Sequence, residues 1–297
     1  MIRALRLLLW LALLAAAGGW FLTRPERLDA AALEGATGDP QQGALVFAAA
    51  GCANCHIAPD ATITDSAPVL SGGRSFATPF GTFRAPNISP DPEHGIGSWS
   101  DAEIVQAIMK GVRRDGAHLY PVFPYAAYAR AEPSDILSLV AYLRTLPPSS
   151  RPSQSHDMVF PFSVRRGLGL WKLMFLRDGW AVAGDLDPAA QRGRYLAEAL
   201  AHCSECHTPR NALGGPERSR WLAGAPNPVG KGEIPNITPA ELDWSAADIA
   251  YYLESGFTPD FDTAGGHMAL VVQSLAQLPG DDRAAIAAYL KAVPPAE

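Results

Sequence analysis

Two copies of a Cys-x-x-Cys-His segment, at residues 52–56 and 203–207, constrain this chain more than any other feature. Two thiols at this spacing can add to the two vinyl groups of one haem, while the adjoining imidazole binds the iron. Each segment therefore predicts one covalently bound haem c. The predicted attachment residues are Cys52, Cys55, Cys203 and Cys206, and the predicted proximal iron ligands are His56 and His207.

Zinc sites and redox disulfides also use Cys-x-x-Cys, but neither requires a histidine directly afterwards in both copies. The two motifs contain all four cysteines of the chain, so none is left for a structural disulfide or a separate metal site. The net charge of -6 argues against nucleic acid as a partner and permits docking on a basic redox partner.

The sequence around the motifs repeats, with one copy from about residue 40 to 148 and another from about 188 to 295. Pro-Asn-Ile-Ser-Pro at residues 86–90 follows the first motif, and Pro-Asn-Ile-Thr-Pro at 235–239 follows the second. Trp99 and Trp244 each stand twelve residues before a glycine, Gly111 and Gly256. One fold is therefore expected to be used twice.

Helical periodicity is present in both copies. Residues 102–110 place apolar side chains on one face and end at a glycine suited to a left-handed cap, and residues 192–200 form a helix leading into the second motif. We expect an all-α fold of two tandem small helical haem domains, each resembling a class I cytochrome c domain. The expected boundaries are 38–150 for the first domain, 151–186 for a packed linker and 187–297 for the second domain.

The N-terminus predicts the cellular compartment. Arg3 and Arg6 precede an apolar run at residues 7–22, which resembles a short membrane anchor or a signal peptide. We favour an uncleaved anchor at residues 1–26, because aromatic residues continue the apolar run past the candidate cleavage region. Positive charge at its front would hold the N-terminus in the cytoplasm. The haem domains would then lie in the periplasm of a bacterium, outside its inner membrane.

The chain resembles the cytochrome c subunits of bacterial membrane-bound dehydrogenases that act on alcohols, gluconate and aldehydes. The resemblance rests on the haem motifs, the two Pro-Asn-Ile segments, residues 116–125 and 160–162, and His-Thr-Pro-Arg-Asn-Ala-Leu-Gly-Gly at 207–215. It implies an electron-relay subunit without catalysis of its own. Such a subunit would accept electrons from the catalytic subunit of a dehydrogenase and pass them to quinone or a terminal cytochrome.

The sixth iron ligands differ between the copies. Met268 lies sixty-one residues after His207 and is the expected ligand of the second haem, with His267 as a competitor. Aligning the repeats through Gly111 and Gly256 places Phe123, which cannot bind iron, opposite Met268. In the dehydrogenase cytochrome subunits that the chain resembles, methionine often stands at the position of Phe123. For the first haem the candidates are His118, Met109 as a competing ligand or core residue, and an open iron. The alternative role of His118 is a hydrogen bond to a haem propionate or to a backbone carbonyl.

The open iron supports one rival function, a dihaem peroxidase, which requires a vacant position on one haem. Around the motifs, Pro59 and Pro209 are predicted to present a carbonyl to the proximal histidines. Arg74, Arg84, Arg210 and Asn211 are candidates for contacts with the haem propionates, with a solvated surface role as the alternative.

Overall fold

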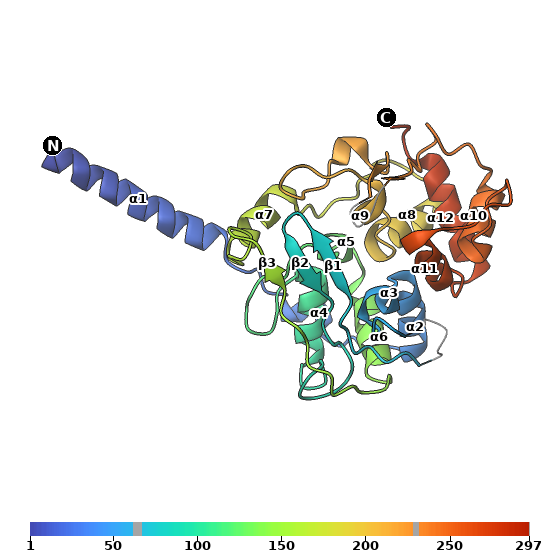
Figure 1. Cartoon of the computed structure of the whole chain (residues 1–297), viewed down its shortest axis with the longest axis horizontal. Coiled ribbons are helices and arrows are strands. Elements are labelled where there is room, and N and C mark those ends of the chain that lie inside the picture. Colours follow the sequence, from blue (N-terminus) through green and yellow to red (C-terminus); the bar gives the residue numbers. More distant parts are fainter. Residues whose placement is uncertain (62–66, 228–231, 297) are drawn as a thin grey trace.

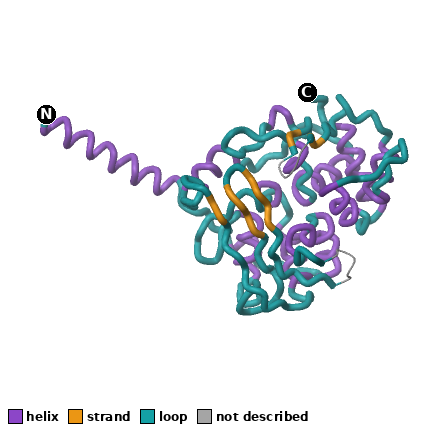
Figure 2. The backbone as a smooth tube through the Cα atoms, viewed as in Figure 1, coloured by secondary structure: helices purple, strands orange, loops and turns teal. Residues whose placement is uncertain are grey.

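Helices are the main regular elements of the structure, a computed structural model that describes residues 1–61, 67–227 and 232–296 (Figures 1 and 2). Those of the first repeat are α2 (Pro40–Ala49), α3 (Cys52–His56), α4 (Asp101–Lys110), α5 (Tyr125–Tyr128) and α6 (Pro133–Leu143). Those of the second are α8 (Pro188–Arg194), η2 (Tyr195–Leu200), α9 (Ser204–His207), η3 (Arg218–Arg220), α10 (Ala246–Ser255), α11 (Gly266–Leu275) and α12 (Gly280–Ala292).

A close helix crossing lies at the centre of each repeat, where α2 packs on α6 and α8 packs on α12. A Cβ atom at Gly43 would lie 1.9 Å from the carbonyl oxygen of Ser138. A Cβ atom at Gly193 would lie 1.8 Å from that of Ala285. Only glycine permits such contact between two backbones, so the sequence sets the same crossing in both repeats.

The middle helix of each repeat begins and ends on matching signals. Ser100 and Glu103 form a capping box at the start of α4, and Ser245 and Asp248 form one at the start of α10. Each helix ends at a glycine in the left-handed region, with φ values of 58° and 77°. The predicted helix at 102–110 is confirmed. The predicted helix at 192–200 continues from α8 into a π-helical turn, η2.

The expectation of an all-α fold is wrong in one respect, because short antiparallel strands lie between the helices (Figure 2). One sheet has the order β1 (Ser75–Thr78), β2 (Gly81–Arg84) and β3 (Asp157–Met158), and the other pairs β4 (Ala225–Pro226) with β5 (Glu233–Ile234). Phe83 on β2 is buried, so the first sheet covers apolar surface. These strands are too short to show an alternating pattern in the sequence.

The segment between the repeats is folded onto both of them. Strand β3 pairs with β2, and α7 (Gly167–Phe175) buries Trp171, whose ring lies 6.2 Å from that of Tyr125. Further along, the buried carboxylate of Glu198 accepts hydrogen bonds from the backbone nitrogens of Ala181 and Val182, at 2.6 and 3.1 Å. The linker is therefore a structural part of the body.

Helix α1 (Ile2–Leu22) projects away from the body (Figure 1). Its mean hydropathy is 1.8, and within the described residues it is the one helix long and apolar enough to cross a membrane. A short 3-10 helix, η1 (Ala30–Leu33), follows it before the first repeat. At the end of α1, Thr23 closely approaches Gly169 of α7, so the apolar helix joins the body beside the linker.

Candidate haem sites

The two motifs form matching helical turns, α3 and α9, and all four cysteines are free thiols. Burial raises the pKa of Cys52 and of Cys203 to about 12. A redox-active cysteine has a lowered pKa, because the thiolate is its reactive form. No group of three or more His, Cys, Asp or Glu side chains among the described residues could hold a metal ion. The raised thiol pKa values therefore do not favour the redox alternative.

The proximal histidines are oriented by backbone carbonyls. Nδ1 of His56 lies 2.9 Å from the carbonyl oxygen of Pro86, and Nδ1 of His207 lies 2.8 Å from that of Pro235. Because a carbonyl only accepts, each bond places the proton on Nδ1 and leaves Nε2 with a lone pair for iron. Burial lowers the pKa of both histidines, which also favours the neutral ring. This donor set fits two covalently held haem groups.

The prediction that Pro59 and Pro209 supply these carbonyls is wrong. The Pro86 and Pro235 carbonyls belong to the Pro-Asn-Ile segments, which the sequence marked as repeat landmarks without a role. A buried asparagine holds each segment. Asn87 donates to the carbonyls of Ser149 and Arg151, both at 2.8 Å, and Asn236 donates to that of Ala296 at 2.7 Å. The end of each repeat thereby fixes the segment that orients its histidine.

The two haem motifs lie next to each other across the boundary between the repeats. Asn54, inside the first motif, accepts a hydrogen bond from the Ser274 hydroxyl of α11 at 3.0 Å. Nε2 of His202, directly before the second motif, lies 3.2 Å from the carbonyl oxygen of Ala50. The pKa of the Cys206 thiol is raised mainly by burial and by the charge of Glu205. Cys55 of the first motif is close enough to add a smaller contribution in the same direction. The predicted haem attachment sites are thus brought together.

The candidate sixth ligands occupy different settings. Met268 lies in the first turn of α11, partly buried against the core, while its neighbour His267 is exposed. His118 is 3% exposed, and its Nε2 lies 3.0 Å from the carbonyl oxygen of Thr23, at the end of α1. Binding iron through that nitrogen would break this contact. The sequence allowed a backbone carbonyl as the alternative partner of His118, and the structure shows such a bond.

Met109 and Phe123, the other two residues considered at the first haem, both make apolar contacts. Met109 is buried in α4 within the core. The ring of Phe123 packs against that of Tyr128, with the centroids 5.6 Å apart. Phe123 has no atom that can bind iron, and the core position of Met109 does not single it out as a ligand.

The arginines proposed for propionate contacts already have protein partners. Arg74 donates to the carbonyl oxygen of Asn54 at 2.8 Å, inside the first motif. Arg84 donates to that of Ser155 at 2.6 Å, and Arg210 pairs with Glu205 of the second motif. Arg74 and Arg210 therefore stabilise the motif turns, while Arg84 ties strand β2 to the linker.

Comparisons with known proteins agree with this geometry. The cytochrome c family model matches residues 40–147, which form the first repeat. A "Diheme cytochrome c-type" protein of Cereibacter sphaeroides is 56% identical over 295 residues, covering 99% of both chains. This chain belongs to the dihaem c-type cytochromes.

The present chain also matches longer proteins. It is 40% identical over 260 residues to the "Fructose dehydrogenase cytochrome subunit" of Gluconobacter japonicus, and the match covers 85% of this chain and 52% of that subunit. It is 34% identical over 271 residues to the "Alcohol dehydrogenase (quinone), cytochrome c subunit" of Gluconacetobacter polyoxogenes, covering 86% and 56%. The dihaem cytochrome thus spans about half the length of these dehydrogenase subunits, and the resemblance predicted from the motifs is confirmed.

Proposed function

We propose that this cytochrome carries two haem c groups, one in each repeat, and relays electrons from the catalytic subunit of a membrane-bound dehydrogenase to quinone or a terminal cytochrome. One observation carries the proposal. Two equivalent haem-attachment turns, each with its histidine oriented by a backbone carbonyl, lie in contact across the repeat boundary. A bound haem c supplies reversible one-electron oxidation and reduction of its iron.

The protein's own task in such a relay is to orient the iron-binding histidines and to fix the two haem motifs relative to each other. The Pro86 and Pro235 carbonyls fix the histidine tautomers, and the asparagine bonds hold these carbonyls still. The bonds from His202 to Ala50 and from Ser274 to Asn54 fix one motif against the other. Because these contacts exist before any electron arrives, little rearrangement of the protein is needed for transfer.

The same proposal assigns each repeat to a cytochrome c domain and α1 to an uncleaved membrane anchor. Two arginines precede the apolar stretch, so the N-terminus would lie in the cytoplasm and the haem domains in the periplasm. Exposure along the whole of α1 supports this assignment, because a soluble protein would bury such a face. The dehydrogenase cytochrome subunits among the relatives support a dehydrogenase as the electron donor.

The rival function, a dihaem peroxidase, rests on Phe123 alone. Its aromatic ring replaces the expected thioether and would leave the first iron open. The relatives named above are a dihaem cytochrome and dehydrogenase subunits, and none of their names describes a peroxidase. The relay therefore remains the function that the observations favour.

The test uses the full chain, matured with haem and held in detergent micelles. We expect two covalent haems per chain, and one in a Cys203→Ser/Cys206→Ser variant. Stopped-flow mixing with a purified quinone-dependent dehydrogenase and its substrate should reduce both haems of the wild type within a few turnovers. Rapid turnover of hydrogen peroxide, with a first haem lacking a sixth ligand, would reject the relay in favour of the peroxidase.

A further inference from the structure

The two repeats contain one turn of identical backbone design, at residues 112–118 in the first and 257–263 in the second. An isolated β-bridge closes each turn, between Val112 and His118 in one and between Phe257 and Thr263 in the other. The backbone bonds inside the two turns also correspond, both at 2.9 Å: Arg113 to Ala117, and Thr258 to Asp262. We name residues 112–118 the covered turn and residues 257–263 the aromatic turn.

The surroundings of the two turns differ. His118 of the covered turn contacts the Thr23 carbonyl, and its own carbonyl accepts a bond from Arg165 at 3.0 Å, so anchor and linker both cover it. In the aromatic turn Phe257 is 45% exposed and Phe261 is 91% exposed. The protein itself occupies this face in the first repeat, whereas in the second it presents aromatic side chains to solvent.

Phe261 is an unfavourable residue for its position in the turn. Its φ is 62°, in the left-handed region, and the equivalent residue of the covered turn is Gly116, with a φ of 80°. Glycine adopts this conformation freely, whereas an aromatic residue is strained there. A ring that is 91% exposed buries almost no surface in return. Strain of this kind concentrates at functional positions, so the Phe261 side chain points to a role outside the fold.

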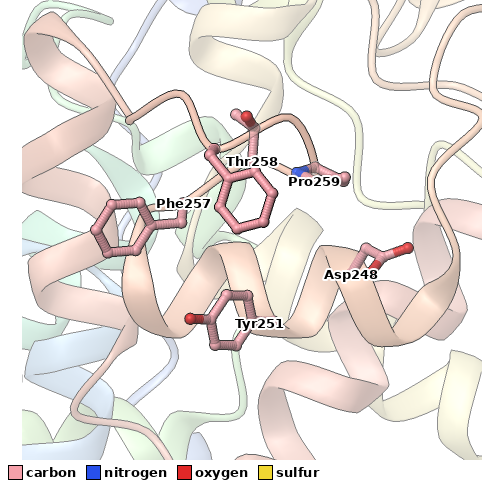
Figure 3. A pocket seen from close by; sticks show the side chains of 6 residues that line it. Asp248, Tyr251, Phe257, Thr258 and Pro259 are labelled. Atoms are coloured by element: carbon pink, nitrogen blue, oxygen red, sulfur yellow. The ribbon is translucent and has the colours of Figure 1, made fainter.

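The aromatic turn and α10 enclose a surface depression of about 330 Å³ (Figure 3). Figure 3 shows Asp248 and Tyr251 on the helix, with Phe257, Thr258 and Pro259 on the loop beside it. Tyr251 is 58% exposed and Phe261 completes the lining. Exposed aromatic residues around a depression form the kind of anchor that protein interfaces use, because their rings have apolar area and little conformational freedom to lose.

The surface around this depression is acidic. Between Gly232 and Gly266 the sequence contains no lysine or arginine. The acidic residues in this stretch, all exposed, are Glu233, Glu241, Asp243, Asp248, Glu254, Asp260 and Asp262. Arg283 pairs with Glu254 at 2.7 Å and offsets one of these charges. Lys291 of α12 donates to the carbonyls of Leu242 and Trp244, at 3.4 and 3.0 Å, and offsets part of the charge at the start of α10. The carboxylates still outnumber these two cations, so the face favours a positively charged partner.

We propose that the aromatic turn, with Tyr251 and the surrounding carboxylates, is the docking surface for a soluble, positively charged electron-transfer protein. The proposal rests on the relay function above and names the chemistry of its acceptor. Weak electron-transfer encounters use small interfaces, and charged rims speed their formation, whereas permanent subunit contacts are larger and more apolar. The turn also leads directly into α11, which carries Met268, the ligand expected for the second haem.

The first experiment measures binding without turnover. The full haem-loaded chain in detergent micelles is titrated calorimetrically with a basic monohaem cytochrome c, both proteins being oxidised. We expect Phe261→Gly and Phe261→Asn to weaken binding several-fold. Both replacements tolerate a left-handed backbone, so their melting temperatures should equal or exceed that of the wild type. Phe160→Ala, which removes a 78% exposed ring from the linker, is the matched control and should bind normally.

The second experiment tests the charge. Asp260→Asn should slow electron transfer to the basic cytochrome at low salt, and added salt should reduce this difference. Asp115→Asn, at the equivalent position of the covered turn, is the control and should leave the rate unchanged. Unaltered binding and rates in the Phe261 and Asp260 variants would overturn the proposal. Loss of a permanently bound subunit from the Phe261 variants would overturn it too, because the face would then be a subunit interface.

A small oxidant separates this proposal from the relay function. Ferricyanide needs no protein interface, so at a salt concentration that screens surface charge it should oxidise the reduced wild type and every variant at the same rate. If ferricyanide fails to accept electrons from the wild-type chain, the relay function itself fails. If ferricyanide reacts normally while the basic cytochrome does not distinguish the variants, only the docking surface is rejected.

Discussion

Nε2 of His202 lies 3.2 Å from the carbonyl oxygen of Ala50, which joins the residue before the second haem motif to the end of α2 before the first. The imidazole also packs edge-on against Tyr128, with ring centroids 5.9 Å apart. His202 has a φ of 43°, and its counterpart in the first repeat is Gly51, with a φ of 57°. The second repeat thus tolerates a strained backbone at the position where its side chain reaches the first.

Replacing His202 should therefore uncouple the repeats more than it destabilises them. His202→Gly removes a hydrogen bond worth about 1 kcal/mol but also removes the left-handed strain. We expect the total change in unfolding free energy to be small, and the single calorimetric transition to separate into two. His202→Asn, which tolerates the backbone and retains a side-chain donor, is the control. A single transition of wild-type shape in His202→Gly would show that other contacts hold the repeats together.

Substitutions at the two helix crossings should, in contrast, lower the stability of the protein substantially. Gly43→Ala and Gly193→Ala each place a methyl group against a carbonyl of the crossing helix. We expect each to lower the unfolding free energy by about 1–3 kcal/mol, because the crossing must open. Gly167→Ala, where a Cβ atom meets nothing within 4 Å, is the control and should stay within about 0.5 kcal/mol of wild type. Denaturant unfolding of the haem-loaded chains measures all three.

Acidification should weaken the contact between β2 and the linker through His156. Nδ1 of His156 accepts a hydrogen bond from the backbone nitrogen of Arg84 at 3.1 Å. Burial and the nearby guanidinium groups of Arg165, Arg84 and Arg113 lower the pKa of His156 to about 4. As the pH falls below about 6.5 the unfolded chain takes up this proton first, so stability is lost until about pH 4.

A His156→Gln variant isolates that contribution. The glutamine oxygen can accept a bond from Arg84 without titrating, so the melting temperature should fall less between pH 6.5 and 4 than in the wild type. His94→Gln removes a histidine elsewhere and should retain the wild-type pH dependence. Parallel slopes for His156→Gln and the wild type would assign the acid sensitivity to other groups.

The sequence predicted the parts of the sites that local spacing determines. The positions of Cys52, Cys55 and His56 relative to one another follow from a single helical turn, and the capped helix ending at Gly111 follows from its flanking residues. The carbonyl of Pro86 lies thirty residues from His56, and only the folded chain brings the two together. Its one sequence signal was the recurrence of the Pro-Asn-Ile segment after both motifs.

Contacts between distant segments were not predictable for the same reason. The bond from His202 to Ala50 spans 152 residues, and the one from Ser274 to Asn54 spans 220. No spacing rule connects such positions. The short strands escaped prediction because two to four residues do not establish a period, and β3 forms only where the linker reaches β2. His118 was considered as a ligand for its sequence distance, whereas the end of α1 provides its partner.

The sixth ligand of the second haem gives the last prediction. A bound thioether produces a weak far-red absorption band in the oxidised protein, and it raises the reduction potential relative to two imidazoles. With Met268 as the ligand, the wild type should show band intensity for one thioether per two haems. Met268→Ala should abolish the band and lower the potential of one haem while retaining both haems covalently. Met109→Leu, which conserves the core volume, is the control and should retain the band.

The alternative outcomes of that measurement are equally specific. Band intensity for two thioethers, half of it lost in Met109→Leu, would assign Met109 to the first iron and contradict the repeat alignment that places Phe123 opposite Met268. A band that persists in Met268→Ala would remove Met268 from the second site. His267, its exposed neighbour in the first turn of α11, would then be tested by the potential of a His267→Ala variant, because loss of an imidazole ligand changes the potential without affecting a thioether band.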